Sequence, residues 1–360
     1  MPDGATYRCT CGYQDVRCNS LCNCASWRPL ETTTECDDLC PFEEQPDVQD
    51  YIGVDETELH KNGRSSQGRI QRKEDYIAYM FLRFMCTPFT KCLGSPLWNK
   101  NAKTKWITKK DKAIQAVQDV IYKEWAYLSV EQIMDIYNML PGKGPRWNAG
   151  LRCPIQFFLN INTSIKVIKY ILKKQTGHVK HSVQAIYDLL NKVKPKRNTL
   201  MIVGAPNAGK TYLVESLAQF CHNTGYLANF NRTTAFPLND CVDRRLIIWN
   251  EPNFEESAAE TLKMILGGDK LAANKKWEDH AHIDRTPVII TTNAQIFNMS
   301  NPVWSSRILV WNWQSLPALK YYTKPIHPAV WINIFEEYIH LNNSSLPENS
   351  LINDIISLLY

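Results

Sequence analysis

Residues 204–211, GAPNAGKT, place two glycines, a lysine and a hydroxyl at the spacing of a phosphate-binding loop. Gly204 and Gly209 would let the backbone wrap closely, so that N–H groups point at phosphate oxygens beside a helix N-terminus. Lys210 would reach the β- and γ-phosphates, and the Thr211 hydroxyl would bind Mg²⁺. The sequence therefore predicts a nucleoside-triphosphate site. Its expected lining is Gly204, Ala205, Pro206, Asn207, Ala208, Gly209, Lys210, Thr211 and Tyr212.

Three polar residues near later apolar runs could complete the chemistry. Glu251 follows LIIWN, where a carboxylate can polarise an attacking water and help to hold Mg²⁺. Asn293 ends PVIITTN, where an amide can orient that water. Arg307, in WSSRILVW, could act as an arginine finger across a subunit boundary. The alternatives are polar residues that merely end strands and a surface arginine at the start of one.

The segment 270–286, KLAANKKWEDHAHIDRT, predicts a hairpin with a basic, aromatic tip. Lys275 and Lys276 would contact phosphates and Trp277 would stack on bases, a combination suited to single-stranded nucleic acid. The alternative is an ordinary solvent-exposed hairpin. For the lysine-rich stretch 100–112, a solvated helix face or loop is favoured over a DNA contact.

The elements that must position these residues alternate along the chain. Short apolar runs at 199–203, 246–249, 287–292 and 308–313 predict strands, and 212–220 has helical periodicity, which indicates a parallel sheet in an α/β domain. Upstream, a first helix is predicted from a cap at Thr163 or Ser164. A second carries a stripe of Val183, Ile186, Leu190 and Val193. A closing helix is predicted over the apolar segment 329–341, with the preceding Pro328 as the first helical position.

The N-terminal part has a different composition. Residues 1–60 contain 3 basic and 13 acidic residues, whereas the remainder contains 38 and 23, which is compatible with a polyanionic partner. Seven of the 12 cysteines lie in the first 40 residues, and they could bind Zn²⁺ or remain free thiols in a poorly ordered tail. They are Cys9, Cys11, Cys18, Cys22, Cys24, Cys36 and Cys40. Because a membrane-length apolar run and a secretory signal are absent from the sequence, we expect a soluble, intracellular protein.

Residues 197–313 resemble a known viral domain in the order of four segments: KRNTLMIVGAPNAGKT, LIIWNEPN, ILGGDKLAANKKW and AHIDRTPVIITTN. They are similar to motifs A, B, B′ and C of the superfamily 3 helicase domain of parvovirus replication initiator proteins, the densovirus branch most closely. By position, Lys276 falls on that family's DNA-contacting loop lysine and Arg307 on its arginine finger.

The resemblance implies an α/β, AAA+-like P-loop ATPase with a central parallel sheet, preceded by a small helical bundle and the Cys-rich segment. The expected parts are 1–45, Cys-rich and acidic; 46–128, linker and basic/aromatic; 129–195, helical oligomerisation module; 196–345, helicase; and 346–360, tail. The implied activity is ATP- and Mg²⁺-dependent unwinding in viral genome replication. A homo-oligomeric ring, expected to be a hexamer, would act on single-stranded and viral origin DNA in the host nucleus, without a membrane. KPKR at 194–197 resembles a nuclear localisation signal or is a solvated stretch.

Two departures from the family pattern bear on activity. Motif B often has paired acids, and here Asn250 replaces the first, which puts the strength of Mg²⁺ binding in question. A nickase would need a His-hydrophobic-His pair and a nucleophilic Tyr. We interpret His280-Ala281-His282 and Tyr170-x-x-x-Lys174 as chance matches and expect no nicking by this chain. The alternatives to a helicase are a small-molecule P-loop kinase and a non-catalytic, zinc-bearing DNA-binding or transactivating protein with a weak ATPase.

Overall fold

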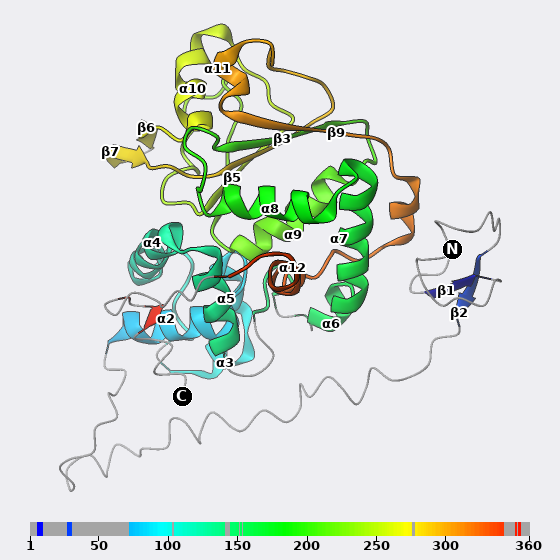
Figure 1. Cartoon of the computed structure of the whole chain (residues 1–360). Helices are drawn as coiled ribbons and strands as arrows, with labels where there is room; N and C mark the ends of the chain where they lie inside the picture. The colour runs from blue at the N-terminus through cyan, green and yellow to red at the C-terminus, as the bar shows by residue number, and fades with distance from the viewer. Residues whose placement is uncertain are drawn as a thin grey trace, which may run out of the picture. The chain divides into compact units, whose positions relative to one another are not determined.

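A computed structural model describes residues 6–9, 27–30, 72–102, 104–140, 145–150, 152, 154–275, 278–341, 350 and 352–353. The chain divides into two compact units, Met1–Gln67 and Gly68–Tyr360 (Figure 1). In the first unit, β1 (Thr6–Cys9) pairs with β2 (Trp27–Leu30) in antiparallel fashion. Cys9 lies in β1, and the six other cysteines of the predicted metal site lie outside the described residues.

The second unit is built on a five-stranded sheet whose paired neighbours are all parallel, in the order β4-β5-β8-β3-β9. Its strands are β3 (Thr199–Gly204), β4 (Thr224–Tyr226), β5 (Leu246–Asn250), β8 (Val288–Thr292) and β9 (Ile308–Trp313). Four of the five were predicted. The three-residue edge strand β4 was missed because it is too short to show a pattern.

Helices cover both faces of this sheet. Side chains alternate along each strand, so Leu200 and Ile202 of β3 face one core and Met201 faces the other. The first face packs on α7 (Ile161–Thr176), α8 (Val179–Leu190), α9 (Lys210–Cys221) and α12 (Val330–Tyr338). The second packs on α10 (Ala259–Gly267) and the hairpin of β6 (Leu271–Lys275) and β7 (Glu278–Ile283). Short elements complete this part: α6 (Pro154–Phe157), η4 (Glu256–Ala258), α11 (Pro302–Ser305) and η5 (Pro317–Tyr321).

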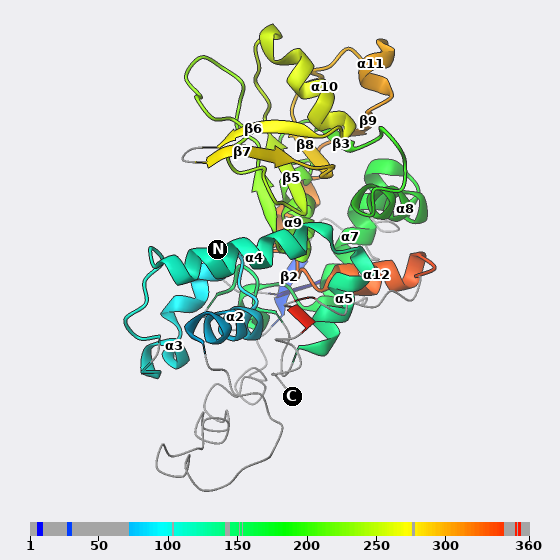
Figure 2. The ribbon, with the colours of Figure 1, turned by 90° about the vertical axis from the view of Figure 1, so that its left-hand side faces the viewer.

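Residues 72–140 form a helical layer against the first face, of which only the part from residue 129 onward was predicted to be helical. Its elements are α2 (Lys73–Phe84), η3 (Phe89–Gly94), α3 (Pro96–Lys100), α4 (Lys112–Tyr127) and α5 (Val130–Met139). Figure 2 shows α2, α4 and α5 below the sheet. The boundary expected at residues 128/129 falls in the two-residue connection between α4 and α5. Of the expected tail 346–360, the described Ser350 donates its hydroxyl to the Glu124 carboxylate of α4 at 2.7 Å.

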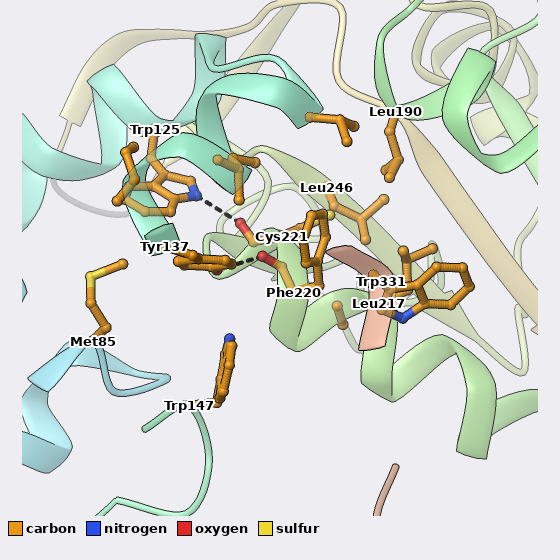
Figure 3. Packing of buried hydrophobic residues seen from close by; sticks show 14 of the residues in the cluster. Met85, Trp125, Tyr137, Trp147, Leu190, Leu217, Phe220, Cys221, Leu246 and Trp331 are labelled. Atoms are coloured by element: carbon orange, nitrogen blue, oxygen red, sulfur yellow. Dashed lines mark hydrogen bonds between the residues drawn. The ribbon is translucent and has the colours of Figure 1, made fainter. Parts of the chain in front are cut away.

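The helical layer holds the end of α9, the helix that follows the phosphate-binding loop. Trp125 Nε1 donates to the carbonyl of Cys221 at 2.8 Å, and the Tyr137 hydroxyl donates to that of Phe220 at 2.6 Å (Figure 3). The last carbonyls of a helix lack partners within it, so these side chains cap α9 at its C-terminus. Because Trp125 and Tyr137 are also buried, they contribute both hydrogen bonds and apolar contact to this junction.

The predicted boundaries of three helices are wrong. The first helix begins at Ile161, because Asn160 caps it by accepting the Asn162 N–H at 2.9 Å. Val193 does not join the stripe of the second helix, which ends at Leu190, and it is exposed. The closing helix begins at Val330, two residues beyond Pro328, and ends at Tyr338. An N-cap sets the first of these boundaries, and turns at 191–192 and 328–329 adjoin the other two helices. Neither feature is visible in the apolar pattern.

Candidate nucleotide site

The predicted phosphate-binding loop joins the C-terminal end of β3 to the N-terminus of α9. A Cβ atom at Gly204 would lie 2.4 Å from the carbonyl oxygen of Trp313, so the close approach of β9 requires glycine. Asn207 and Gly209 adopt the left-handed region, with φ of 63° and 88°. Gly209 is the N-cap of α9 and provides no side-chain cap. The first-turn N–H groups are therefore free of a side-chain cap, as an anion-binding helix terminus requires.

Lys210 is held at the centre of this site. Its Nζ donates to the carbonyls of Gly204 at 2.5 Å and Ala205 at 3.1 Å and to Oδ1 of Asn293 at 2.9 Å. The residue is only 7% exposed. Burial lowers the pKa of the Lys210 ammonium, and the nearby Glu251 carboxylate opposes that shift. A phosphate arriving here would offer a stronger, charge-assisted partner than these neutral oxygens.

Glu251 and Asn293 come from the ends of neighbouring strands. Glu251, at the end of β5, has a positive φ of 45°, and its N–H donates to the Thr291 carbonyl at 2.8 Å. Its Oε2 accepts the N–H of Asn293 at 3.3 Å. The structure thus brings Lys210, Glu251 and Asn293 together, as their positions at strand ends predict, while their catalytic roles stay predictions.

The Asn250 side chain forms its hydrogen bond with Thr291 and not with Lys210, Glu251 or Asn293. Its Oδ1 accepts the Thr291 hydroxyl at 2.6 Å, which ties the end of β5 to β8. Glu251 is consequently the one acidic side chain that motif B contributes to this group.

The other lining residues differ in accessibility. Thr211 is exposed at the first turn of α9, where its hydroxyl can reach a cation. Pro206 is also exposed, whereas Ala208 is buried beneath the loop. Tyr212 is half-buried, and its hydroxyl donates to the Lys324 carbonyl at 2.7 Å. Tyr212 therefore joins the start of α9 to the segment before α12.

Arg307 lies at the N-terminal ends of the parallel strands, whereas the phosphate-binding loop of the same chain lies at their C-terminal ends. It precedes Ile308, which pairs with Thr199 at the start of β3, whereas the loop follows Gly204 at the end of β3. Six residues of parallel strand separate these levels, a distance of about 20 Å. Arg307 donates from Nε to the Lys263 carbonyl at 3.0 Å and from Nη1 to that of Val303 at 2.7 Å. It cannot reach its own nucleotide site.

The predicted hairpin is present as β6 and β7, with Lys275 as the last residue of β6. Lys276 and Trp277 lie outside the described residues. His280 and His282 lie in β7. In the part of the chain that the structure describes, no group of three or more His, Cys, Asp or Glu side chains could hold a metal ion. Over the same ranges, no helix has the length and apolar character needed to cross a membrane.

Sequence reasoning missed the residues that hold the loop from outside. Gln175, near the end of α7, donates from Nε2 to the carbonyls of Ala208 at 3.0 Å and Gln314 at 2.6 Å. Its Oε1 accepts the Gln314 N–H at 2.8 Å. The Leu316 N–H donates to the Asn207 carbonyl at 3.0 Å. No local motif signals these contacts, because Gln175 and Gln314 are 139 residues apart.

Gln175→Ala should raise the KM for ATP several-fold and leave kcat nearly unchanged. The substitution removes one hydrogen bond to the loop carbonyl of Ala208 and two that tie α7 to Gln314, each worth about 1 kcal/mol. It leaves Lys210, Glu251 and Asn293 in place. Steady-state phosphate release checks this result. Gln184→Ala is the matched control, because Gln184 bonds Asp188 on its own helix. An unchanged KM in folded Gln175→Ala protein would contradict the positioning role.

Comparisons with known proteins identify the region that carries these motifs. Residues 163–306 match the family model described as parvovirus non-structural protein NS1. Initiator protein NS1 of Bombyx mori densovirus is 41% identical over 160 residues, which cover 44% of this chain and 18% of that protein. Initiator protein NS1 of Junonia coenia densovirus is 27% identical over 318 residues, which cover 81% of this chain and 57% of that protein. The predicted resemblance to the parvovirus initiator proteins is confirmed, and the chain spans only part of their length.

Among solved structures, a JCV helicase aligns over 82% of this chain and 93% of its own, with a TM-score of 0.47 and 10% identity. At that level the assignment rests on the sequence matches. The matched residues 163–306 contain all four motifs and end one residue before Arg307.

Proposed function

From the match of residues 163–306 to parvovirus NS1, we propose that this chain is an ATP-driven DNA helicase of viral genome replication. It works as an AAA+-like P-loop motor that translocates on single-stranded DNA as an oligomeric ring, expected to be a hexamer. The observation that carries the proposal is the convergence of Lys210, Glu251 and Asn293 at the carboxyl ends of three adjacent parallel strands. Ligand sites in such sheets lie at that edge.

Each of these residues has a distinct role in hydrolysis. Lys210 leaves its carbonyl partners for the β- and γ-phosphates and compensates the charge that develops there. Glu251 accepts a proton from the attacking water, and the Asn293 amide holds that water in line. Thr211 and Glu251 fit Mg²⁺, since an exposed hydroxyl and a carboxylate beside the phosphates are its usual ligands. When bound, the ion would supply positive charge that offsets the negative charge of the phosphates.

The ring supplies what one chain lacks. Because Arg307 lies at the far edge of the sheet from its own nucleotide, it acts on the γ-phosphate held by a neighbouring copy. The guanidinium keeps its bonds to Lys263 and Val303, which aim it from a fixed base. Residues 129–195, the helical oligomerisation module, help to join the copies. The exposed run KPKR at 194–197 serves import into the host nucleus, where viral origin DNA is the partner.

A second candidate is a non-catalytic, zinc-bearing nonstructural protein with a weak ATPase. The observation that favours it is Asn250, which is bonded to Thr291 and brings no second carboxylate to the site. Phosphate release with and without single-stranded DNA separates the two candidates. A helicase hydrolyses ATP and is stimulated by DNA, whereas the second candidate shows neither strong turnover nor stimulation.

Lys276→Ala should lower the DNA-stimulated ATPase rate more than the basal rate. Removing one phosphate contact should also weaken single-strand binding and reduce the salt slope, d log K/d log [salt], by about 0.7. Fluorescence anisotropy across a salt series measures the slope. Lys180→Ala, on the exposed surface of α8, is the control. Unchanged DNA affinity and unwinding in Lys276→Ala would make the hairpin an ordinary surface loop.

A further inference from the structure

The connection between α3 and α4 holds an aromatic side chain in solvent. Trp106 is 82% exposed, more than any other large hydrophobic residue that the structure describes. Its neighbours Thr104 and Ile107 are buried, so the connection is anchored on both sides of the indole. Hydrogen bonds fix the turn, from Thr104 Oγ1 to the Trp98 carbonyl at 2.7 Å and from the Ile107 N–H to the Thr104 carbonyl at 2.8 Å. Trp106 is therefore presented by a defined turn.

Exposed lysines flank this indole along the chain. Five are exposed along the connection and its flanks: Lys100, Lys105, Lys109, Lys110 and Lys112. Lys105 Nζ lies 5.4 Å from the centre of the Trp106 ring. The neighbouring acid, Asp111, is already engaged, since it pairs with Lys73 at 2.9 Å and accepts the Ala113 N–H at 2.9 Å. These bonds lower the pKa of Asp111, with the Lys73 contact as the main cause. The five ammonium groups therefore face solvent with little neutralisation.

We propose that the surface formed by Trp106 and these five lysines binds single-stranded nucleic acid. Unpaired bases stack on the indole, and the lysines contact the backbone phosphates. The charge pattern decides between occupants. Protein interfaces are depleted in lysine at their centres and bury clusters of apolar side chains, whereas here one exposed aromatic residue lies in a stretch of chain with five exposed lysines. A duplex keeps its bases stacked and offers no free face to the indole, so the single strand is the better fit.

The position of this surface also allows one single strand of nucleic acid to contact both Trp106 and the hairpin of β6 and β7. This part of the inference rests on the proposed function. Helix α4 begins next to the connection and ends at Tyr127, whose hydroxyl donates to Asp284 at 2.6 Å, one residue beyond β7. A helix of 16 residues spans about 24 Å. Figure 2 shows the connection before α4 and the hairpin of β6 and β7 toward the same side of the molecule.

The test measures binding of a fluorescein-labelled thymidine oligonucleotide to the full chain without ATP, at low and high salt. Trp106→Ala should weaken binding roughly 5- to 100-fold with an unchanged salt slope, because a stacking partner is lost. Trp106→Phe should recover most of that loss. Neutralising Lys105, Lys109 and Lys110 together with glutamine should reduce the salt slope by about 2. ATP hydrolysis without DNA should be unchanged in all of them.

Two control variants remove the same types of side chain, lysine and an aromatic residue, at exposed positions outside this surface. Lys173→Gln with Lys174→Gln removes two exposed charges from α7, and Tyr226→Ala removes another exposed aromatic side chain. Both should bind the oligonucleotide like the parent. Parent-like binding by Trp106→Ala and by the lysine variant at both salts would overturn the proposal. The proposal would also be overturned if these variants lost binding to anionic vesicles but still bound the oligonucleotide, because that result would indicate a lipid surface. Because the assay contains no ATP, failure of the helicase proposal would appear separately, as a parent that binds DNA but does not hydrolyse ATP.

Discussion

Lys210→Ala should abolish ATP hydrolysis, with a loss of at least about 100-fold in kcat, while the protein stays folded. Removing one preorganised charge donor at a developing charge costs about 100- to 1,000-fold in kcat. Every hydrogen-bond partner found for the Lys210 ammonium belongs to the nucleotide site, namely Gly204, Ala205 and Asn293. Alanine is also a favourable residue at the start of α9, so the helix should persist.

Phosphate release at saturating ATP measures this loss, and thermal unfolding of the same sample reports the fold. Lys174→Ala, an exposed lysine on α7, is the matched control and should keep full turnover. Turnover by Lys210→Ala within a few-fold of the parent would contradict the assignment of the phosphate-binding loop.

Glu251→Gln should retain nucleotide binding and lose hydrolysis by about 100-fold or more, comparable to the loss of a positioned general base. Glutamine keeps an oxygen to accept the Asn293 N–H, so the junction between β5 and β8 is preserved. What disappears is the negative charge that opposes the lowering of the Lys210 pKa and that accepts the proton. Binding of a fluorescent nucleotide, measured beside phosphate release, separates the two effects.

The companion variant is Asn250→Asp. A carboxylate there can still accept the Thr291 hydroxyl, so the end of β5 should hold its position. Higher turnover or tighter Mg²⁺ binding in this variant would support a site that operates with one acid. If Glu251→Gln instead hydrolyses ATP like the parent, another group is the base and the proposed role of Glu251 is wrong.

The nucleotide site was predictable from the sequence because its signals are local. The loop at 204–211 encodes its own turn through Gly204 and Gly209, and apolar runs mark the strands that carry Glu251 and Asn293. Parallel strands end at one edge, so three separate segments could be placed together without knowing their order in the sheet.

The supports of that site could not be predicted in the same way. Gln175 forms hydrogen bonds with Gln314, which is 139 residues away in the sequence, and the Tyr212 hydroxyl donates to a carbonyl 112 residues away. Such contacts depend on the packed arrangement and leave no periodic trace. The helices between residues 72 and 127 were not predicted, because the lysine-rich and aromatic composition of this part was interpreted through its charge. Their apolar stripes, such as Ile114, Val117 and Ile121 of α4, are nevertheless buried at helical spacing.

The capping of α9 by Trp125 and Tyr137 shows that the folded unit extends upstream of the residues that the family model matches. The segment that matches the viral family begins at residue 163, after both caps. A fragment reduced to 163–306 would lose both hydrogen-bond donors at the C-terminus of α9 and the apolar contacts of the buried Trp125 and Tyr137. A fragment that omits residues 72–140 is therefore expected to be less stable than the second unit as a whole.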